Sequence, residues 1–134
     1  MAKVKKKVEV DDSCEAYLPK LGIKFHVPVG IKPSELVYEL ATGDGGKALV
    51  FTDILMNLPP LPGFDGWLMG KLGSTGFFGM TRIGRMLLLS DKKQFKAWLE
   101  KMAENKEVTV ISVAHGDVTS QDCQKALSAA AARL

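Results

Sequence analysis

Two side chains of metal-binding type follow two of the most apolar runs in the sequence. Asp53 ends the run "KALVFTD", and His115 ends the run "VTVISVAH" just before Gly116. Strand ends hold functional side chains rigidly while the loops beyond them leave room for a ligand. A carboxylate and a neutral imidazole together suit zinc, with iron or manganese as alternatives. Two ligands hold a metal poorly, so a second interpretation stays open, in which Asp53 caps a turn and His115 bonds the backbone.

The segment 54–79 is the second candidate region, because it combines prolines and glycines with large apolar side chains. A solvated linker would not carry so many apolar groups, so we expect this loop to pack against something or to cover a small ligand. Its glycines match neither a phosphate-binding loop nor a dinucleotide fingerprint. The candidate lid or ligand residues are Asn57, Phe64, Trp67, Phe77 and Phe78.

The elements before this loop are predicted to be strands. Valines alternate with lysines over residues 4–10, which predicts an edge strand whose lysines block strand addition. A short strand is expected at 23–27, and the runs "ELVYELAT" and "KALVFTD" around "GDGG" predict a hairpin. Because "ALVF" lacks polar alternation, this strand is expected to be covered on both faces.

The elements after the loop are predicted to be helix, helix, strand, helix. "MTRIGRMLLL" predicts a helix despite Gly84, and Asp91 with Gln94 forms a capping-box start for the next one. An apolar stripe at helical spacing follows at Phe95, Trp98, Leu99 and Met102. A buried strand is expected over 108–114. Thr119 with Asp122 is expected to open the last helix, whose inward residues would be Cys123, Leu127, Ala130 and Leu134.

Together these elements predict one α+β domain over residues 1–134, with its helices and its sheet in separate layers. Residues 1–53 would be mainly β, 54–79 a Gly/Pro/aromatic loop, and 80–134 the α-α-β-α part. A mixed sheet with helices packed on one face fits this order. The other sheet face would then be an association site unless something covers it.

Composition excludes several classes of function. With 46% hydrophobic and 25% charged residues, the chain reads as an ordinary globular protein, and no apolar run is long enough to span a bilayer. The lysine-rich start lacks the apolar core of a secretion signal, so a cytoplasmic location is expected. The net charge of +3 is too small to favour nucleic-acid binding. The two cysteines form no metal or redox motif and are expected to be buried.

Several of these motifs resemble the second half of the metallo-β-lactamase fold. "KALVFTDILMN" ends in the position of the aspartate that bridges two metals in that superfamily, matched by Asp53. "ISVAHGD" is similar to the later strand that ends in a metal-binding histidine followed by glycine, matched by His115. "VPVGIKPSELVYEL" resembles the family's Pro-Gly-His-Thr-Pro-Gly-Glu turn, with Pro33 and Glu35 in place. The resemblance covers roughly residues 20 to 134, about half of a full family domain.

The departures from the family limit what the resemblance implies. Ile31 stands where the turn would supply a metal-binding histidine, and the first-half motif His-x-His-x-Asp-His is absent. His26 occupies no metal position of the family and is expected to be an ordinary strand histidine. The full fold has two sheets face to face in an αββα sandwich, so a lone half would leave its inner sheet face bare. The resemblance therefore implies a homodimer in which a second copy replaces the missing half.

Three functions remain open on the sequence. The first is a non-catalytic relative of metallo-β-lactamase-fold proteins that binds no metal and acts by self-association or binding. The second is a metal-dependent hydrolase whose site is completed by a dimer partner or another chain, with the metal activating water. The third is a small-ligand binder that uses the aromatic loop. The isolated chain is thus expected to lack enzymatic activity, with the second reading as its alternative.

Overall fold

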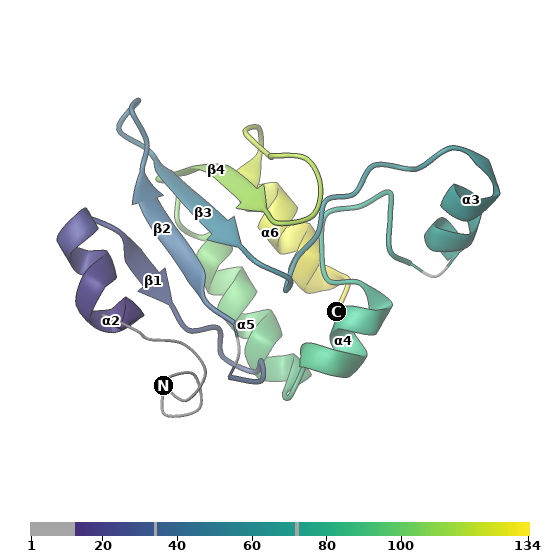
Figure 1. Cartoon of the computed structure of the whole chain (residues 1–134), viewed down its shortest axis with the longest axis horizontal. Coiled ribbons are helices and arrows are strands. Elements are labelled where there is room, and N and C mark those ends of the chain that lie inside the picture. Colours follow the sequence, from purple (N-terminus) through teal and green to yellow (C-terminus); the bar gives the residue numbers. More distant parts are fainter. Residues whose placement is uncertain (1–12, 34, 72) are drawn as a thin grey trace.

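The computed structural model describes residues 13–33, 35–71 and 73–134. Over these residues the chain is α+β, with a four-stranded mixed sheet and five α-helices (Figure 1). The elements follow in the order α2 (Cys14–Tyr17), the 3-10 helix η1 (Leu18–Leu21), β1 (Lys24–His26), β2 (Val37–Ala41), β3 (Lys47–Phe51), α3 (Gly63–Lys71), α4 (Arg82–Leu88), α5 (Lys92–Ala103), β4 (Val108–Val113) and α6 (Cys123–Ala132).

The sheet has the strand order β1-β2-β3-β4. The first two pairings are antiparallel, and β3 pairs with β4 in parallel. The predicted β2–β3 hairpin is confirmed, because Asp44 accepts hydrogen bonds from the Thr42 hydroxyl and from the Gly46 N–H, and Gly45 takes a φ of +84°. The parallel pairing brings the ends of β3 and β4 to the same edge, where Asp53 and His115 follow them.

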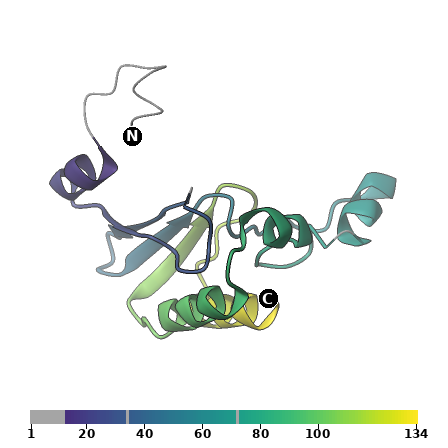
Figure 2. The same cartoon turned by 90° about the horizontal axis from the view of Figure 1, so that it is seen from below.

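One face of the sheet is covered by α5 and α6, which lie side by side behind it (Figures 1 and 2). Leu49, Phe51 and Ile111 project from the strands into this layer and are fully buried. They join Phe95 and Leu99 of α5 and Leu127 of α6 in one cluster. Each such side chain is worth roughly 1.5–3 kcal/mol of burial, so this layer holds the fold together.

Helix α5 forms as its sequence predicts. The Asp91 carboxylate accepts the Gln94 N–H at 3.0 Å, and the Gln94 side-chain amide donates back to the other carboxylate oxygen at 3.0 Å. Phe95 and Leu99 are buried, and Trp98 and Met102 pack against the cluster at its margin. The capping signal and the apolar stripe are therefore both confirmed.

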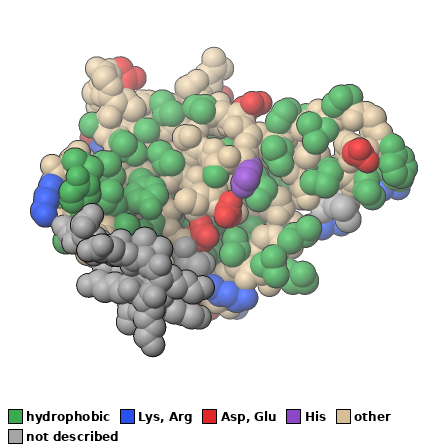
Figure 3. Space-filling model, viewed as in Figure 1, with side chains coloured by type: hydrophobic (Ala, Val, Ile, Leu, Met, Phe, Trp, Pro, Cys, Tyr) green, Lys and Arg blue, Asp and Glu red, His purple; other side chains and the backbone are tan. Residues whose placement is uncertain are grey.

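The opposite sheet face is open. The strand register places side chains of β1 to β4 on it in rows, and all of them are only half-buried; they are Phe25, Tyr38, Leu40, Ala48, Val50, Val110 and Ser112. Figure 3 is drawn from this side and shows hydrophobic side chains gathered over β1 to β3. The expectation that β3 is covered on both faces is therefore wrong for the described residues, because both long helices pack on the same side.

Other local expectations are corrected. The segment 54–79 is not wholly loop, since it contains α3. The described part of residues 1–53 holds three strands together with the short helices α2 and η1. The last helix begins at Cys123 and not near Thr119, because Thr119 pairs with Ile111 in an isolated bridge. Cys123 is buried as expected, whereas Cys14 is exposed. The predicted strand over 4–10 lies outside the described residues.

The described helices are all too short or too polar to cross a membrane. The longest of them, α5, has 12 residues and carries lysines on its outer side.

Candidate functional site

Asp53 and His115 meet at the shared edge of β3 and β4. His115 Nε2 lies 3.1 Å from Asp53 Oδ1, and the two side chains are 54% and 58% exposed. The chain brings them together because β3 and β4 run in parallel and end at the same level. The carboxylate orients the imidazole, while most of both groups remains open to solvent.

The segment after His115 is fixed by a tight junction with Asn57. The Asn57 N–H donates to the His115 carbonyl oxygen at 3.0 Å, and the Asp117 N–H donates to the Asn57 carbonyl oxygen at 3.0 Å. Gly116 between them has a φ of +121°, and a Cβ there would lie 2.2 Å from the Asn57 carbonyl group. Glycine is therefore required next to His115 on steric grounds alone.

Asn57 itself serves this junction. Its side-chain amide nitrogen donates to the Asp117 carbonyl oxygen at 2.8 Å and lies 3.3 Å from Thr119 Oγ1. The amide is thus engaged in joining the segment after β3 to the loop after β4. Its position in this junction gives it a structural role that the sequence pattern did not indicate.

Glu35 brings a second carboxylate to the end of β3. It accepts a hydrogen bond from the Thr52 hydroxyl, and the Asp53 N–H points to the same carboxylate oxygen at 3.4 Å. Ile31, in the same turn, is buried and pairs with Leu89 in an isolated bridge. The turn therefore supplies an apolar anchor at Ile31, the position where the resemblance to the metallo-β-lactamase fold would predict a metal-binding histidine.

The residues present do not fit a two-metal centre. Among the residues that the structure describes, no group of three or more histidine, cysteine, aspartate or glutamate side chains is arranged to hold a metal ion. A catalytic zinc needs three protein ligands, and the pair at the strand ends supplies two. An exposed Asp–His pair can accept or pass a proton, but neither side chain is itself a strong nucleophile.

An apolar groove of about 360 Å³ begins beside Asp53. It runs between the segment after β3 and helix α4, and Met56, Leu58, Ile83 and Leu87 line it. Ile83 and Leu87 are more than half exposed. A small apolar group bound here would lie next to the Asp53 carboxylate.

The predicted lid residues do not form one lid. Phe64 and Trp67 stack on each other in α3, with ring centroids 5.6 Å apart, and are 73% and 53% exposed. Phe77 lies instead under the Arg133 guanidinium, and Phe78 packs against the buried cluster. The expectation that the segment 54–79 packs against something is not met by α3, whose Phe64, Trp67 and Leu68 are exposed. Figure 2 shows this helix projecting away from the sheet.

A charged network across β1, β2 and β3 was not anticipated from the sequence. His26 Nε2 lies 2.9 Å from a Glu39 carboxylate oxygen, and Lys47 lies 3.5 Å from Glu39 and 2.6 Å from Glu107. Burial raises the pKa of Glu39, but the His26 hydrogen bond and the Lys47 charge outweigh it, so the pKa lies below its ordinary value. Only the register between β1, β2 and β3 brings these residues together, which explains why spacing along the chain did not reveal them.

Comparison with known proteins adds no family to this geometry. No family model matches the sequence, and no curated protein sequence matches it. The likeness to metallo-β-lactamase-fold proteins therefore remains a prediction drawn from the motifs around Glu35, Asp53 and His115.

Proposed function

We propose that this chain is a non-catalytic association module, related to half of a metallo-β-lactamase fold, that pairs with a second copy of itself through the open sheet face. The observation that carries the proposal is that apolar side chains of neighbouring strands lie next to one another across that face. Phe25, Tyr38 and Val50 stand side by side across three strands, in register with Ser112 of β4. An apolar face of this kind gains about 25 cal/mol for each Å² that it buries.

The chemistry of the face favours a second copy as the occupant. Among the described residues, the rows on this face contain no charged side chain, so two copies can meet without placing like charges together. Leu18 and Ile23 extend the face beyond the sheet and, with Tyr38, Leu40 and Val50, line an apolar hollow of about 320 Å³. A two-fold pair would place the same surface on both sides and could fill each hollow with the partner's side chains.

The test is the mass of the full chain in solution, measured by sedimentation over a wide concentration range. We expect a concentration-dependent dimer that Val50→Glu dissociates. Met86→Glu is the matched control, because Met86 is exposed on α4, away from the sheet rows. A wild-type chain that stays monomeric at the highest concentration would overturn the proposal, as would a dimer that survives Val50→Glu.

The hydrolase is the second candidate, and the 3.1 Å contact between Asp53 and His115 is what favours it. It requires ligands from another chain, since the described residues supply too few. Metal content of the purified native protein, measured by mass spectrometry, separates the two functions. Near-stoichiometric zinc, iron or manganese that is lost in His115→Ala would support the hydrolase, whereas a metal-free dimer supports the association module.

A further inference from the structure

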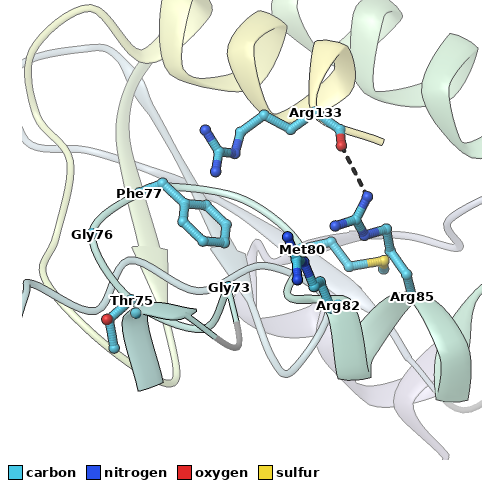
Figure 4. A pocket seen from close by; sticks show the side chains of 9 residues that line it. Gly73, Thr75, Gly76, Phe77, Met80, Arg82, Arg85 and Arg133 are labelled. Atoms are coloured by element: carbon cyan, nitrogen blue, oxygen red, sulfur yellow. Dashed lines mark hydrogen bonds between the residues drawn. The ribbon is translucent and has the colours of Figure 1, made fainter. Parts of the chain in front are cut away.

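Three arginines converge on a pocket that lies apart from both the strand ends and the open sheet face. Arg82 and Arg85 come from α4, and Arg133 comes from the end of α6. They surround a hollow of about 330 Å³ whose remaining wall is the glycine-rich segment before α4 and the ring of Phe77. Figure 4 shows Arg133 reaching from α6 toward Phe77, with Arg82 and Arg85 rising from α4 below.

No described acidic side chain balances the charge of the three arginines at this pocket. Within the part of the chain that the structure describes, no aspartate or glutamate lines the pocket, and none of the three arginines forms an ion pair with an acidic side chain. Three like charges around one hollow repel each other. An anion that enters the hollow relieves this repulsion.

Two of the three guanidinium groups, those of Arg85 and Arg133, are also held in place. Arg85 Nη1 donates to the carbonyl oxygen of Arg133 at 3.1 Å and to a terminal carboxyl oxygen of Leu134 at 3.4 Å, which ties α4 to the end of α6. The Arg133 guanidinium lies 3.9 Å above the centre of the Phe77 ring. These contacts reduce the conformational entropy that the arginines would lose on binding.

Arg82 packs closely against Gly73. A Cβ on Gly73, which has a φ of +67°, would come within 3.1 Å of Arg82 Nε. Any larger residue would therefore press on the Arg82 side chain. Arg85 already uses Nη1 at the end of α6, whereas the guanidinium groups of Arg82 and Arg133 make no hydrogen bond to described residues and have more N–H donors left for a ligand.

We propose that this pocket binds the phosphate group of a small molecule, with Arg82 and Arg133 as the principal donors. Planar guanidinium forks bind phosphate oxygens in pairs, and two of them match a doubly charged phosphate better than a single carboxylate. The volume is at the low end for small-ligand pockets, which suits a small phosphate ester or free phosphate. The Phe77 ring offers an apolar wall for the rest of an ester.

The experiment is calorimetric titration of the full chain with inorganic phosphate and with phenyl phosphate, against sodium chloride at equal ionic strength. We expect saturable binding of at least one phosphate compound, weakened about tenfold or more in Arg82→Gln and in Arg133→Gln. Lys125→Gln is the matched control, because it removes one exposed positive charge from α6 away from the pocket, and it should leave binding unchanged. Tighter binding of phenyl phosphate would assign the site to esters, and equal or tighter binding of inorganic phosphate would assign it to the free ion.

Two outcomes would overturn the proposal. One is heat that chloride reproduces at the same ionic strength. The other is binding that Lys125→Gln weakens as much as the two arginine variants do, since that would mean attraction by overall charge and not by this pocket. Circular dichroism spectra that match the wild-type spectrum would show that each variant is folded.

Discussion

The two faces of the sheet are formed by the same strands, but the side chains on them are buried to different extents. On the covered face, Leu49 and Phe51 alternate with the open-face residues Ala48 and Val50, and only the first pair is fully buried. Both faces are largely apolar, so hydrophobicity alone does not distinguish them. What distinguishes them is that α5 and α6 both pack on one side. The uncovered side is therefore the surface through which we propose that the chain associates.

The largest expected effect tests this contrast with one residue type on both faces. Leu49→Ala on the covered face should lower the free energy of unfolding by about 2–5 kcal/mol, because it opens a cavity in a closed layer. Leu40→Ala on the half-buried open face should cost about 1 kcal/mol in the monomer. Urea denaturation at low protein concentration measures both.

Raising the protein concentration sharpens the same comparison. If the open face pairs with a second copy, wild-type stability should rise with concentration, and Leu40→Ala should lose much of that gain. Leu49→Ala should keep the gain while remaining less stable throughout. Equal losses in the two variants at every concentration would contradict the distinction between the faces.

The next effect concerns the edge where the strands end. Gly116→Ala should destabilise the chain by about 1–3 kcal/mol, because it forces a positive φ and a clash with the Asn57 carbonyl. Gly43→Ala in the hairpin turn is the control, since its Cβ would meet open space. Thermal unfolding of the two variants separates the effect of replacing any loop glycine by alanine from the effect of disrupting the junction beside His115.

How much of this architecture the sequence could predict depended on whether a signal was local. The α5 start needed only Asp91 and Gln94, and the hairpin needed only the Asp-Gly turn, so both were predicted correctly. Which face each helix covers depends on long-range packing, so β3 was wrongly expected to be covered on both sides. Helix α3 was missed for a different reason, because its glycines and the prolines just before it disguised a nine-residue helix.

The candidate sites followed the same rule. Asp53 and His115 were identified because each ends an apolar run, and parallel pairing then brought them together. Arg82, Arg85 and Arg133 were not identified, because about fifty residues separate α4 from the end of α6 and no motif links them. The spacing of Arg82 and Arg85, three apart on one helix, was the only signal available.

The two helices that cover the core begin differently, and this predicts a smaller effect. Asp91 caps α5 with its side chain, so Asp91→Ala should cost about 1 kcal/mol. Asp122 precedes α6 with a φ of +51°, and its side chain makes no capping hydrogen bond with the described residues. Asp122→Gly should therefore be neutral or slightly stabilising, because glycine adopts this backbone conformation without strain. Urea denaturation of the pair measures the difference, and a larger loss in Asp122→Gly would contradict it.

The smallest effect concerns the only acidic side chain buried among the described residues, Glu39 beside the covered face. Burial alone would raise the pKa of Glu39, but the His26 hydrogen bond and the Lys47 charge together lower it by more. The pKa therefore lies below its ordinary value of 4.5. A carboxyl group with a depressed folded-state pKa stabilises the fold above the unfolded-state pKa. That contribution fades as the pH falls below about 4.5 and through the folded value. We therefore expect the stability gap between wild type and Glu39→Gln to be widest near neutral pH and to narrow in acid.

Thermal unfolding of both proteins between pH 3 and pH 7 measures this gap. Glu104→Gln is the control, since Glu104 is exposed at the end of α5, and its gap to wild type should stay small across the range. A Glu39 gap that widened in acid would mean that the carboxylate is destabilising in the folded chain. The network of His26, Glu39 and Lys47 would then not stabilise the fold. The contrast between the two faces would in that case rest on apolar packing alone.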